Sequence, residues 1–181
     1  FYADGHNPEK LAVNLRQTRV YDTKGTGIPN LASVGVILAG FVEEIADATW
    51  EEAGLIYPMS VRYYDALNAA GVNVTYQVHS GGHDLPSFHK ELKALLAWGL
   101  FKPVPTHPST WTNKTVATSG QLWDVGYRFM TPPTSVVRFE RRGSTLSISA
   151  AGSPVRITTS DGCTTTTPTP AVIHLPPANC G

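Results

Sequence analysis

A histidine on a glycine-rich turn is the residue in this chain best suited to chemistry. His83 lies in the segment His79-Ser-Gly-Gly-His-Asp-Leu-Pro86. The alternating residues 72–78 predict a strand before this turn, and an apolar-periodic run to Leu100 predicts a helix after it. A histidine placed in this way can act as a general base when a nucleophile and an orienting carboxylate reach its ring. From the residues alone, a loop histidine that only caps or packs locally is equally compatible.

The carboxylate that would orient such a histidine has several candidates in the segment 41–52. This segment contains five acidic residues, Glu43, Glu44, Asp47, Glu51 and Glu52. Acidic residues at that density are typical of a solvated face. Glu51 and Glu52 lie closest to the helix that helical spacing predicts over Met59–Ala70 and that leads into the histidine strand. The residues alone leave all five open.

The sequence provides no serine in the pattern expected for an esterase nucleophile. That pattern, G-x-S-x-G, holds the serine on a sharp turn between a strand and a helix. Ser33 has Gly35 two residues after it but Leu31, not a glycine, two residues before it, and Ser80 lies in the histidine loop itself. We therefore predict that this chain contains no nucleophile.

A metal-dependent chemistry is not predicted either. His79, His83 and His89 are close in sequence, but a turn does not give them the pairing of a helix, and no third ligand has a natural spacing. The two cysteines do not form a C-x-x-C pair. We expect no metal and no cofactor.

Composition and charge describe a globular chain without a nucleic-acid or membrane partner. Of 181 residues, 41% are hydrophobic, which is enough to build a core. The 14 basic and 14 acidic residues are scattered, so the basic footprint that nucleic acids or anionic membranes require is lacking. No apolar run approaches the roughly 20 residues of a membrane-spanning helix, and no transmembrane segment is predicted.

Cys163 and Cys180 lie in a final segment rich in threonine and proline. Their position predicts a disulfide that closes a short loop, worth about 3 kcal/mol in the chain-entropy model. Two buried thiols are the alternative. A disulfide would indicate an extracytoplasmic compartment, so we expect a secreted or cell-envelope protein.

The composition changes near Lys102–Pro108, where three prolines disfavour a helix. We predict an α/β part over 1–102, a linker or crossover over 103–120 and a small β-rich module over 121–181. In the first part, the pattern predicts a strand, a helix, a strand and a helix at 18–22, 59–70, 72–78 and 86–100. In the module, it predicts strands at 121–129, 135–139, 145–149 and 154–158, a turn at 142–144 and an extended loop at 164–170.

Several motifs between Asn7 and Leu100 resemble those of one family. They are Asn7-Pro8 with Leu11, Leu15 and Arg19-Val-Tyr21, the loop Gly25-Thr-Gly27, the helix end Asp65–Gly71, and Gly82-His83 followed by Pro86, Phe88, Glu91 and Leu92. The last set resembles the pattern G-x-H-S-W-x-x-W-x-x-x-L. Together they resemble the α/β-hydrolase esterases that include the antigen 85 mycolyltransferases and related actinobacterial secreted esterases. Asp84 and Leu85 depart from the family's Ser-Trp.

The resemblance implies an α/β fold class. The chain would comprise the carboxyl-terminal strands and helices of a partial α/β-hydrolase, followed by a small all-β sandwich-like module. It implies that His83 is the base and Glu52 the acid, with Glu51 as the alternate. The family's serine lies on an earlier strand, so the nucleophile would come from an N-terminal segment or chain of the same precursor.

The function expected from this resemblance is serine-dependent ester hydrolysis or acyl transfer through an acyl-enzyme, on a lipid or acyl ester and with water or a sugar hydroxyl as acceptor. A non-catalytic cell-envelope or carbohydrate-binding protein is the alternative. For that alternative, four aromatic residues of the β module would either form a platform for sugars or be ordinary core; they are Trp111, Trp123, Tyr127 and Phe129.

Overall fold

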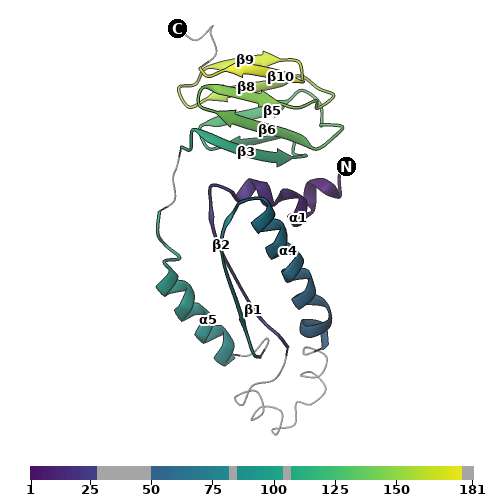
Figure 1. The fold of residues 1–181 in the computed structure, drawn as a ribbon. Helices are drawn as coiled ribbons and strands as arrows, with labels where there is room; N and C mark the ends of the chain where they lie inside the picture. Colours follow the sequence, from purple (N-terminus) through teal and green to yellow (C-terminus); the bar gives the residue numbers. More distant parts are fainter. Residues whose placement is uncertain (28–49, 82–84, 104–106, 177–181) are drawn as a thin grey trace. The chain divides into compact units, whose positions relative to one another are not determined.

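The computed structural model describes residues 1–27, 50–81, 85–103 and 107–176 (Figure 1). The chain divides into two compact units. The β unit comprises residues 1–18, 70–72 and 104–181, and the βα unit comprises residues 19–69 and 73–103.

The βα unit is built on two parallel strands. Strand β1 (Arg19–Gly25) pairs with β2 (Asn73–His79) in a continuous register from Arg19↔Asn73 to Gly25↔His79. A π-helical segment, η3 (Glu52–Ile56), leads directly into helix α4 (Tyr57–Ala69), which precedes β2. Helix α5 (Leu85–Trp98) follows β2. The order is therefore strand, helix, strand, helix.

Helices α4 and α5 contact opposite faces of the strand pair. The Tyr64 ring of α4 stacks on the Tyr76 ring, with 4.1 Å between the centroids. Trp98 of α5 donates its indole N–H to the Thr75 hydroxyl at 2.9 Å. Since neighbouring residues of a strand point to opposite faces, α4 and α5 cover one face each. With only two strands, most side chains of the pair nevertheless stay partly exposed.

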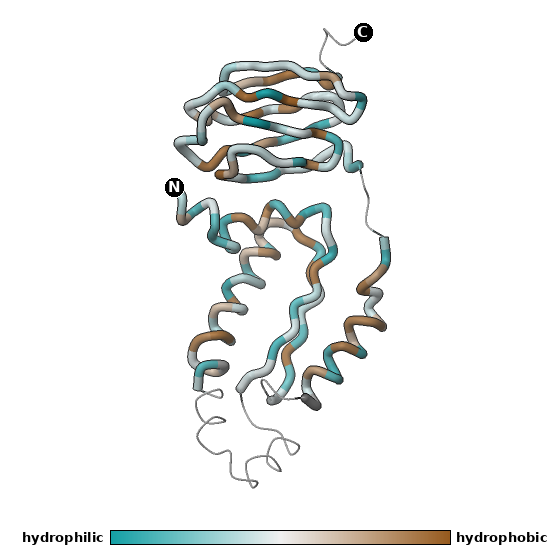
Figure 2. The backbone as a smooth tube through the Cα atoms, turned by 180° about the vertical axis from the view of Figure 1, so that it is seen from behind, coloured by the Kyte–Doolittle hydropathy of each residue, from teal (hydrophilic) through white to brown (hydrophobic). Residues whose placement is uncertain are grey.

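Helix α5 has an apolar side that its own unit does not cover completely. Figure 2 shows apolar residues recurring along this helix, and Leu92 and Leu96 are each half exposed. None of the described helices is long and apolar enough to cross a membrane.

The β unit is a sandwich of two four-stranded antiparallel sheets. Sheet I has the order β10-β7-β6-β3, and sheet II has the order β4-β5-β8-β9. The strands are β3 (Thr110–Thr115), β4 (Ser119–Leu122), β5 (Val125–Phe129), β6 (Val137–Arg142), β7 (Thr145–Ile148), β8 (Val155–Thr159), β9 (Thr164–Thr167) and β10 (Ala171–His174).

Alternating apolar residues of both sheets form the core of the sandwich. Its fully buried members include Trp111, Phe129, Phe139, Leu146 and Ile157. Three of its rings contact one another: the Phe139 centroid lies 4.8 Å from that of Tyr127 and 6.1 Å from that of Phe129, and the last two are 5.7 Å apart. Aromatic rings in this arrangement contribute large buried areas, so this cluster dominates the packing of the unit.

The first residues of the chain belong to the β unit. They form three short helical segments, η1 (Asp4–His6), α1 (Pro8–Leu11) and η2 (Ala12–Leu15). Asn7 caps α1 by accepting from the backbone amides of the next turn. The Asn14 side chain bonds both to the Lys114 carbonyl at 2.9 Å and to its amide N–H at 2.7 Å, which attaches this segment to β3.

The expected fold class, a partial α/β-hydrolase followed by an all-β module, is wrong. The described residues are mostly β, with ten strands in three sheets and three short α-helices. Only β1 and β2 are parallel, whereas an α/β-hydrolase alternates strands and helices around a larger, mostly parallel sheet. The physical reason is that periodicity and glycine turns specify local pieces of structure. They do not specify how many strands join the same sheet.

The predicted boundaries also differ from the observed strands. The predicted strand at 121–129 is a hairpin, because Trp123 adopts a positive φ of 55° between β4 and β5. Residues 103–120, predicted as a linker, include β3, which pairs with β6. Residues 164–167, predicted as part of a loop, form β9 against β8.

We predict that Phe139→Ala lowers the free energy of unfolding of the β unit by about 3–5 kcal/mol, because it leaves a cavity in the aromatic cluster. Urea unfolding followed by circular dichroism measures this change. Val172→Ala is the matched control, since that side chain is 72% exposed and its loss should change the free energy by less than about 0.5 kcal/mol. Equal effects of the two substitutions would show that Phe139 is not part of a packed core.

Candidate functional site

The candidate site lies where β1 and β2 end. Because the strands are parallel, their carboxyl ends meet at the same edge of the sheet. Pairing continues past the strands: the Thr26 amide donates to the His79 carbonyl at 2.9 Å, and the Gly27 amide donates to the Gly81 carbonyl at 3.1 Å. We call the residues 24–27 and 79–81 the strand-end stem.

Two glycines of this stem have backbone conformations that side chains rarely allow. Gly27 has a φ of 72° and Gly81 has a φ of 95°. A side chain at either position would be strained, so these turns require glycine. Gly81 is two residues before His83 in the sequence, so the segment leading to His83 starts from a backbone conformation that only glycine readily adopts.

The start of α4 lies at the same edge. Lys24, at the end of β1, is 5% exposed and donates from Nζ to the Tyr57 carbonyl at 3.1 Å. The same Nζ lies 4.6 Å from the Tyr57 ring centroid and 4.8 Å from that of Tyr76. A carbonyl and two ring faces thus help to hold a buried ammonium.

Acidic and phenolic groups on the α4 side of the strands share this desolvated environment. Ser60 donates its hydroxyl to Asp22 at 3.3 Å. Burial raises the pKa of Asp22, although the Lys24 charge and the Ser60 hydrogen bond act in the opposite direction. Burial and the negative charge of Asp22 raise the pKa of Tyr63 and of Tyr76, whose buried hydroxyl has no hydrogen-bond partner among the described residues. The bonds from Ser60 to Asp22 and from Lys24 to Tyr57 join α4 to β1.

His79 is held between β2 and α5. Its Nδ1 lies 2.8 Å from the Ser80 carbonyl oxygen, and its Nε2 lies 2.5 Å from Oε1 of Glu91. The two side chains are only 13% and 20% exposed. Both ring nitrogens of His79 therefore face acceptor oxygens of the protein. These contacts attach the end of β2 to α5 and leave neither nitrogen turned toward a substrate.

The predicted catalytic pair falls largely outside the described residues. His83 and Ser33 lie outside them. Glu52 is the first residue of η3, and Glu51 lies just before it with an exposed side chain. The pairing of His83 with Glu52, or with the alternate Glu51, stays a prediction.

The predicted disulfide also involves a residue outside the described ranges. Cys163 follows the turn after β8, next to Asp161, whose carboxylate accepts from the Cys163 amide at 3.2 Å. Cys180 lies beyond the last described residue. The bond between them stays a prediction.

No group of three or more His, Cys, Asp or Glu residues in the described ranges could hold a metal ion. Of the three histidines near the turn, His79 is bound to Glu91, and His89 is an exposed residue of α5.

The aromatic platform considered for sugar binding is wrong. Trp111, Tyr127 and Phe129 are between 2% and 7% exposed and belong to the core. Trp123 packs against that core, 5.2 Å from the Trp111 ring. Alternation along β5 turns its aromatic side chains into the sandwich, so they cannot contact a ligand at its surface.

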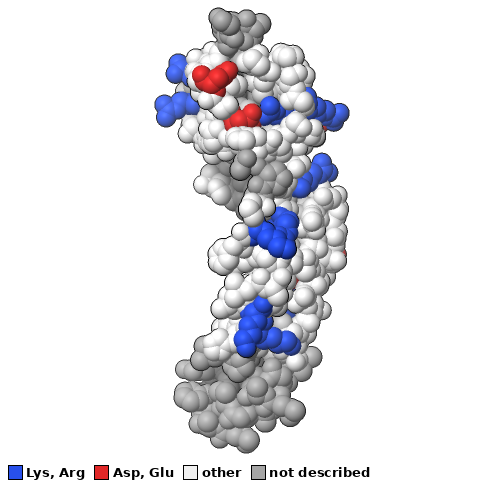
Figure 3. All heavy atoms as spheres, turned by 90° about the vertical axis from the view of Figure 1, so that its left-hand side faces the viewer, with Lys and Arg blue, Asp and Glu red and all other residues white. Residues whose placement is uncertain are grey.

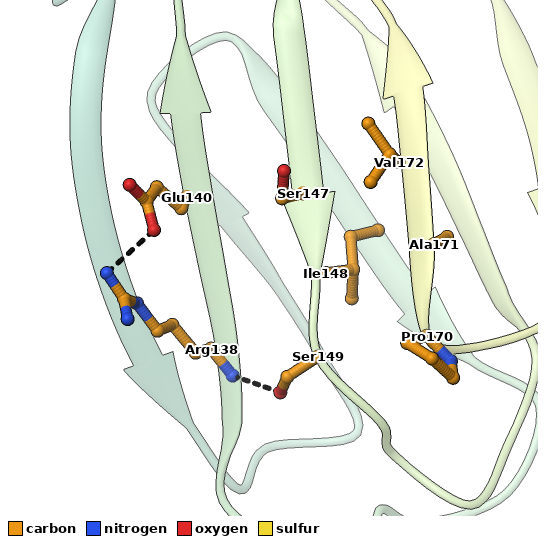
Figure 4. Close-up of a pocket in the computed structure, with 8 residues that line it drawn as sticks. All are labelled: Arg138, Glu140, Ser147, Ile148, Ser149, Pro170, Ala171 and Val172. Carbon is orange, nitrogen blue, oxygen red and sulfur yellow. Dashed lines mark hydrogen bonds and ion pairs between the residues drawn. The ribbon is translucent and has the colours of Figure 1, made fainter.

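A shallow hollow of about 370 Å³ lies on sheet I (Figure 4). Its polar groups are bonded to one another: Arg138 pairs with Glu140 at 2.6 Å, and the Arg138 amide donates to the Ser149 hydroxyl at 2.9 Å. Val172 and Pro170 complete the rim. Because Arg138 and Glu140 neutralise each other, the hollow offers a ligand no unpaired charge from either residue.

Glu91, Lys24 and Tyr57 were not predicted as site residues. A histidine that ends a strand and an acid in the second turn of the next helix are a usable signal for the His79–Glu91 pair. The contact between Lys24 and Tyr57 joins residues 33 positions apart and follows only from the tertiary structure.

No family model, curated protein or solved structure matches this chain. The resemblance to the antigen 85 type of esterase therefore stays a prediction.

We predict that His79 and Glu91 are energetically coupled. In a double-mutant cycle of His79→Gln and Glu91→Gln, thermal unfolding should give an interaction energy of about 1.5–3 kcal/mol, as expected for a hydrogen bond to a charged group with little exposure. His89→Gln paired with Glu91→Gln is the control and should be additive. Additivity within about 0.5 kcal/mol for the His79 cycle would contradict the structural role assigned to this histidine.

Proposed function

We propose that this chain contributes the histidine and the acid of a serine-dependent ester hydrolase or acyltransferase. The strand-end stem is the observation that carries the proposal. It fixes the start of a glycine-rich loop at the carboxyl edge of a parallel strand pair, where catalytic loops are commonly found. His83 is two residues beyond the stem in the sequence.

The position of His79 supports the choice of His83 as the base. Both ring nitrogens of His79 are engaged, by Ser80 and by Glu91. Of the two histidines that flank the glycine pair, His83 is therefore the one proposed to exchange protons with substrate.

The position of α4 supports Glu52 as the acid, with Glu51 as the alternate. The bond from Lys24 to the Tyr57 carbonyl places the first residue of α4 at the end of β1. The segment η3, which begins with Glu52, immediately precedes Tyr57. An acid from this segment would reach the site from the α4 side.

The proposed reaction proceeds through an acyl-enzyme. His83 takes the proton of a serine hydroxyl as its oxygen attacks the ester carbonyl, and the acid orients the imidazole and stabilises its charged form. The imidazolium then gives that proton to the leaving alcohol as the carbon–oxygen bond breaks. Water or a sugar hydroxyl next attacks the acyl group, with His83 again taking the proton.

The serine and the oxyanion-hole amides are proposed to come from polypeptide outside residues 1–181, since no serine here has the elbow pattern. The substrate proposed is a lipid or acyl ester, and the location proposed is secreted or cell-envelope, in keeping with the predicted disulfide. No cofactor is needed for this reaction.

We predict that the protein isolated together with any polypeptide bound to it hydrolyses p-nitrophenyl butyrate, and that a fluorophosphonate labels a serine outside residues 1–181. His83→Gln should lower kcat by about a thousandfold or more, because the serine then lacks its base. Glu52→Gln should lower kcat by a smaller factor than His83→Gln. Glu51→Gln should leave kcat unchanged if Glu52 is the acid, and should lower it if Glu51 is.

His89→Gln is the matched control for the loss of a histidine, since His89 is exposed on α5 and is assigned no role. It should leave kcat unchanged. Fluorophosphonate labelling of Ser33 or Ser80, or full activity of His83→Gln, would overturn the proposal.

A further inference from the structure

The outer face of sheet II presents two arginines from its central strands. Val125, Tyr127 and Phe129 of β5 are buried in the core, so Arg128 between them points outward and is exposed. In the same way, Arg156 lies between the buried Val155 and Ile157 of β8 and is exposed.

The sheet register places these arginines side by side. Arg128 is directly opposite Arg156, and the same row continues to Ser119 on β4 and to Thr166 on β9. All four side chains are therefore on the same face. Neighbouring strands are about 4.8 Å apart, so the row spans about 14 Å across the sheet. We call it the arginine row.

Two like charges in directly opposed positions destabilise a sheet unless something neutralises them. In the part of the chain that the structure describes, neither guanidinium of the row has a hydrogen bond or an ion pair. This arrangement costs stability in the isolated protein and suits a site that receives an anion.

The arginines of β6, in contrast, are neutralised within the protein. Arg138 and Arg142 share the Glu140 carboxylate at 2.6 and 2.5 Å, and Arg141 pairs with Asp124 at 2.5 Å. The hydrogen bond from Arg142, followed by the nearby positive charges, lowers the pKa of Glu140 despite some desolvation. Arginines of this protein are therefore paired on β6, and the two arginines of the row on sheet II differ from them in having no such partner among the described residues.

We propose that the arginine row binds an acidic polysaccharide. A planar guanidinium takes a carboxylate through two parallel hydrogen bonds, and two of them on adjacent strands can hold carboxylates of one chain or share one of them. The hydroxyls of Ser119 and Thr166 at the two ends suit sugar hydroxyls.

The neighbouring row of the same face fits a chain of sugars. It contains Gln121 opposite Gly126, Gly126 opposite Thr158, and Thr158 opposite Thr164. The Gln121 amide lies over Gly126 and donates to the Trp123 carbonyl at 2.6 Å. The face beside the arginines thus carries an amide and two hydroxyl groups, which can bond to sugar hydroxyls.

The surroundings favour a saccharide over a nucleic acid. The chain has a formal net charge of zero, and the side shown in Figure 3 carries Lys and Arg in several separate groups, with acidic side chains among those of the β unit. Nucleic-acid binding draws on many cations, and single strands also require exposed aromatic rings for stacking. The arginine row has two cations and no aromatic residue.

The full chain should bind polygalacturonate in affinity electrophoresis and calorimetry at low salt and should not bind neutral dextran. Arg128→Gln and Arg156→Gln should each weaken binding by about tenfold or more, and the double variant should abolish it. Arg128→Lys keeps the charge but loses the paired hydrogen bonds, so it should fall between wild type and Arg128→Gln.

Arg142→Gln is the matched control, because Arg142 is an exposed arginine of the other sheet and is already paired with Glu140. It should change affinity by less than about twofold, and circular dichroism should show that every variant remains folded. Failure of the folded wild-type chain to bind polygalacturonate, unchanged binding by the double variant, or tighter binding to an oligonucleotide of equal charge would each overturn the proposal. These results do not depend on esterase activity, since the row and the strand-end stem belong to different units.

Discussion

The parallel pairing of β1 with β2 is the constraint on which the candidate site depends. It brings the ends of two strands, separated in sequence by more than fifty residues, to one edge of a sheet. The bonds from Thr26 to His79 and from Gly27 to Gly81 extend that pairing into the loops. The loop after β2 therefore leaves from a point that the backbone itself determines. A histidine on this loop gains a defined starting position, which is a precondition for general-base catalysis.

The groups around this edge have complementary tasks. On the α5 side, the His79–Glu91 pair joins the end of β2 to a helix that also carries the half-exposed side chains of Leu92 and Leu96. On the α4 side, Lys24 joins the end of β1 to the first residue of α4. In both cases a charged group with little exposure is compensated by groups from a neighbouring element, as burial of charge requires. Polar contacts between elements therefore stabilise the site, whereas an apolar core stabilises the β unit.

The sequence was informative wherever local periodicity determines structure. Alternation and helical spacing predicted β1, α4, β2 and α5 to within a few residues, because each is an uninterrupted run with clear turn residues. The hairpin at β4–β5 was missed because its turn contains Trp123 at a positive φ, where glycine or asparagine would be expected. Strand β9 was missed because four threonines with nearby prolines are typical of a loop, although paired β-branched residues also suit an edge strand.

Tertiary relations were beyond the reach of the sequence pattern. Nothing in residues 1–18 indicates that they pack with β3, since the side-chain bonds of Asn14 to Lys114 cross one hundred positions. The same holds for the fold class, because the number of strands in a sheet depends on long-range pairing. The opposed pair Arg128 and Arg156 was equally hidden, since it follows from the register between β5 and β8. Such a surface can be identified only once the pairing register of its strands is known.

The central proposal is that His83 exchanges protons with substrate, while both ring nitrogens of His79 are engaged by Ser80 and Glu91. The rate at which diethyl pyrocarbonate modifies each histidine, followed by peptide mass spectrometry, tests this claim most directly. The account predicts rapid modification of His83 and slow modification of His79, with His79 becoming reactive when Glu91 is replaced by glutamine. Rapid modification of His79 in the unaltered protein, with His83 protected, would contradict it.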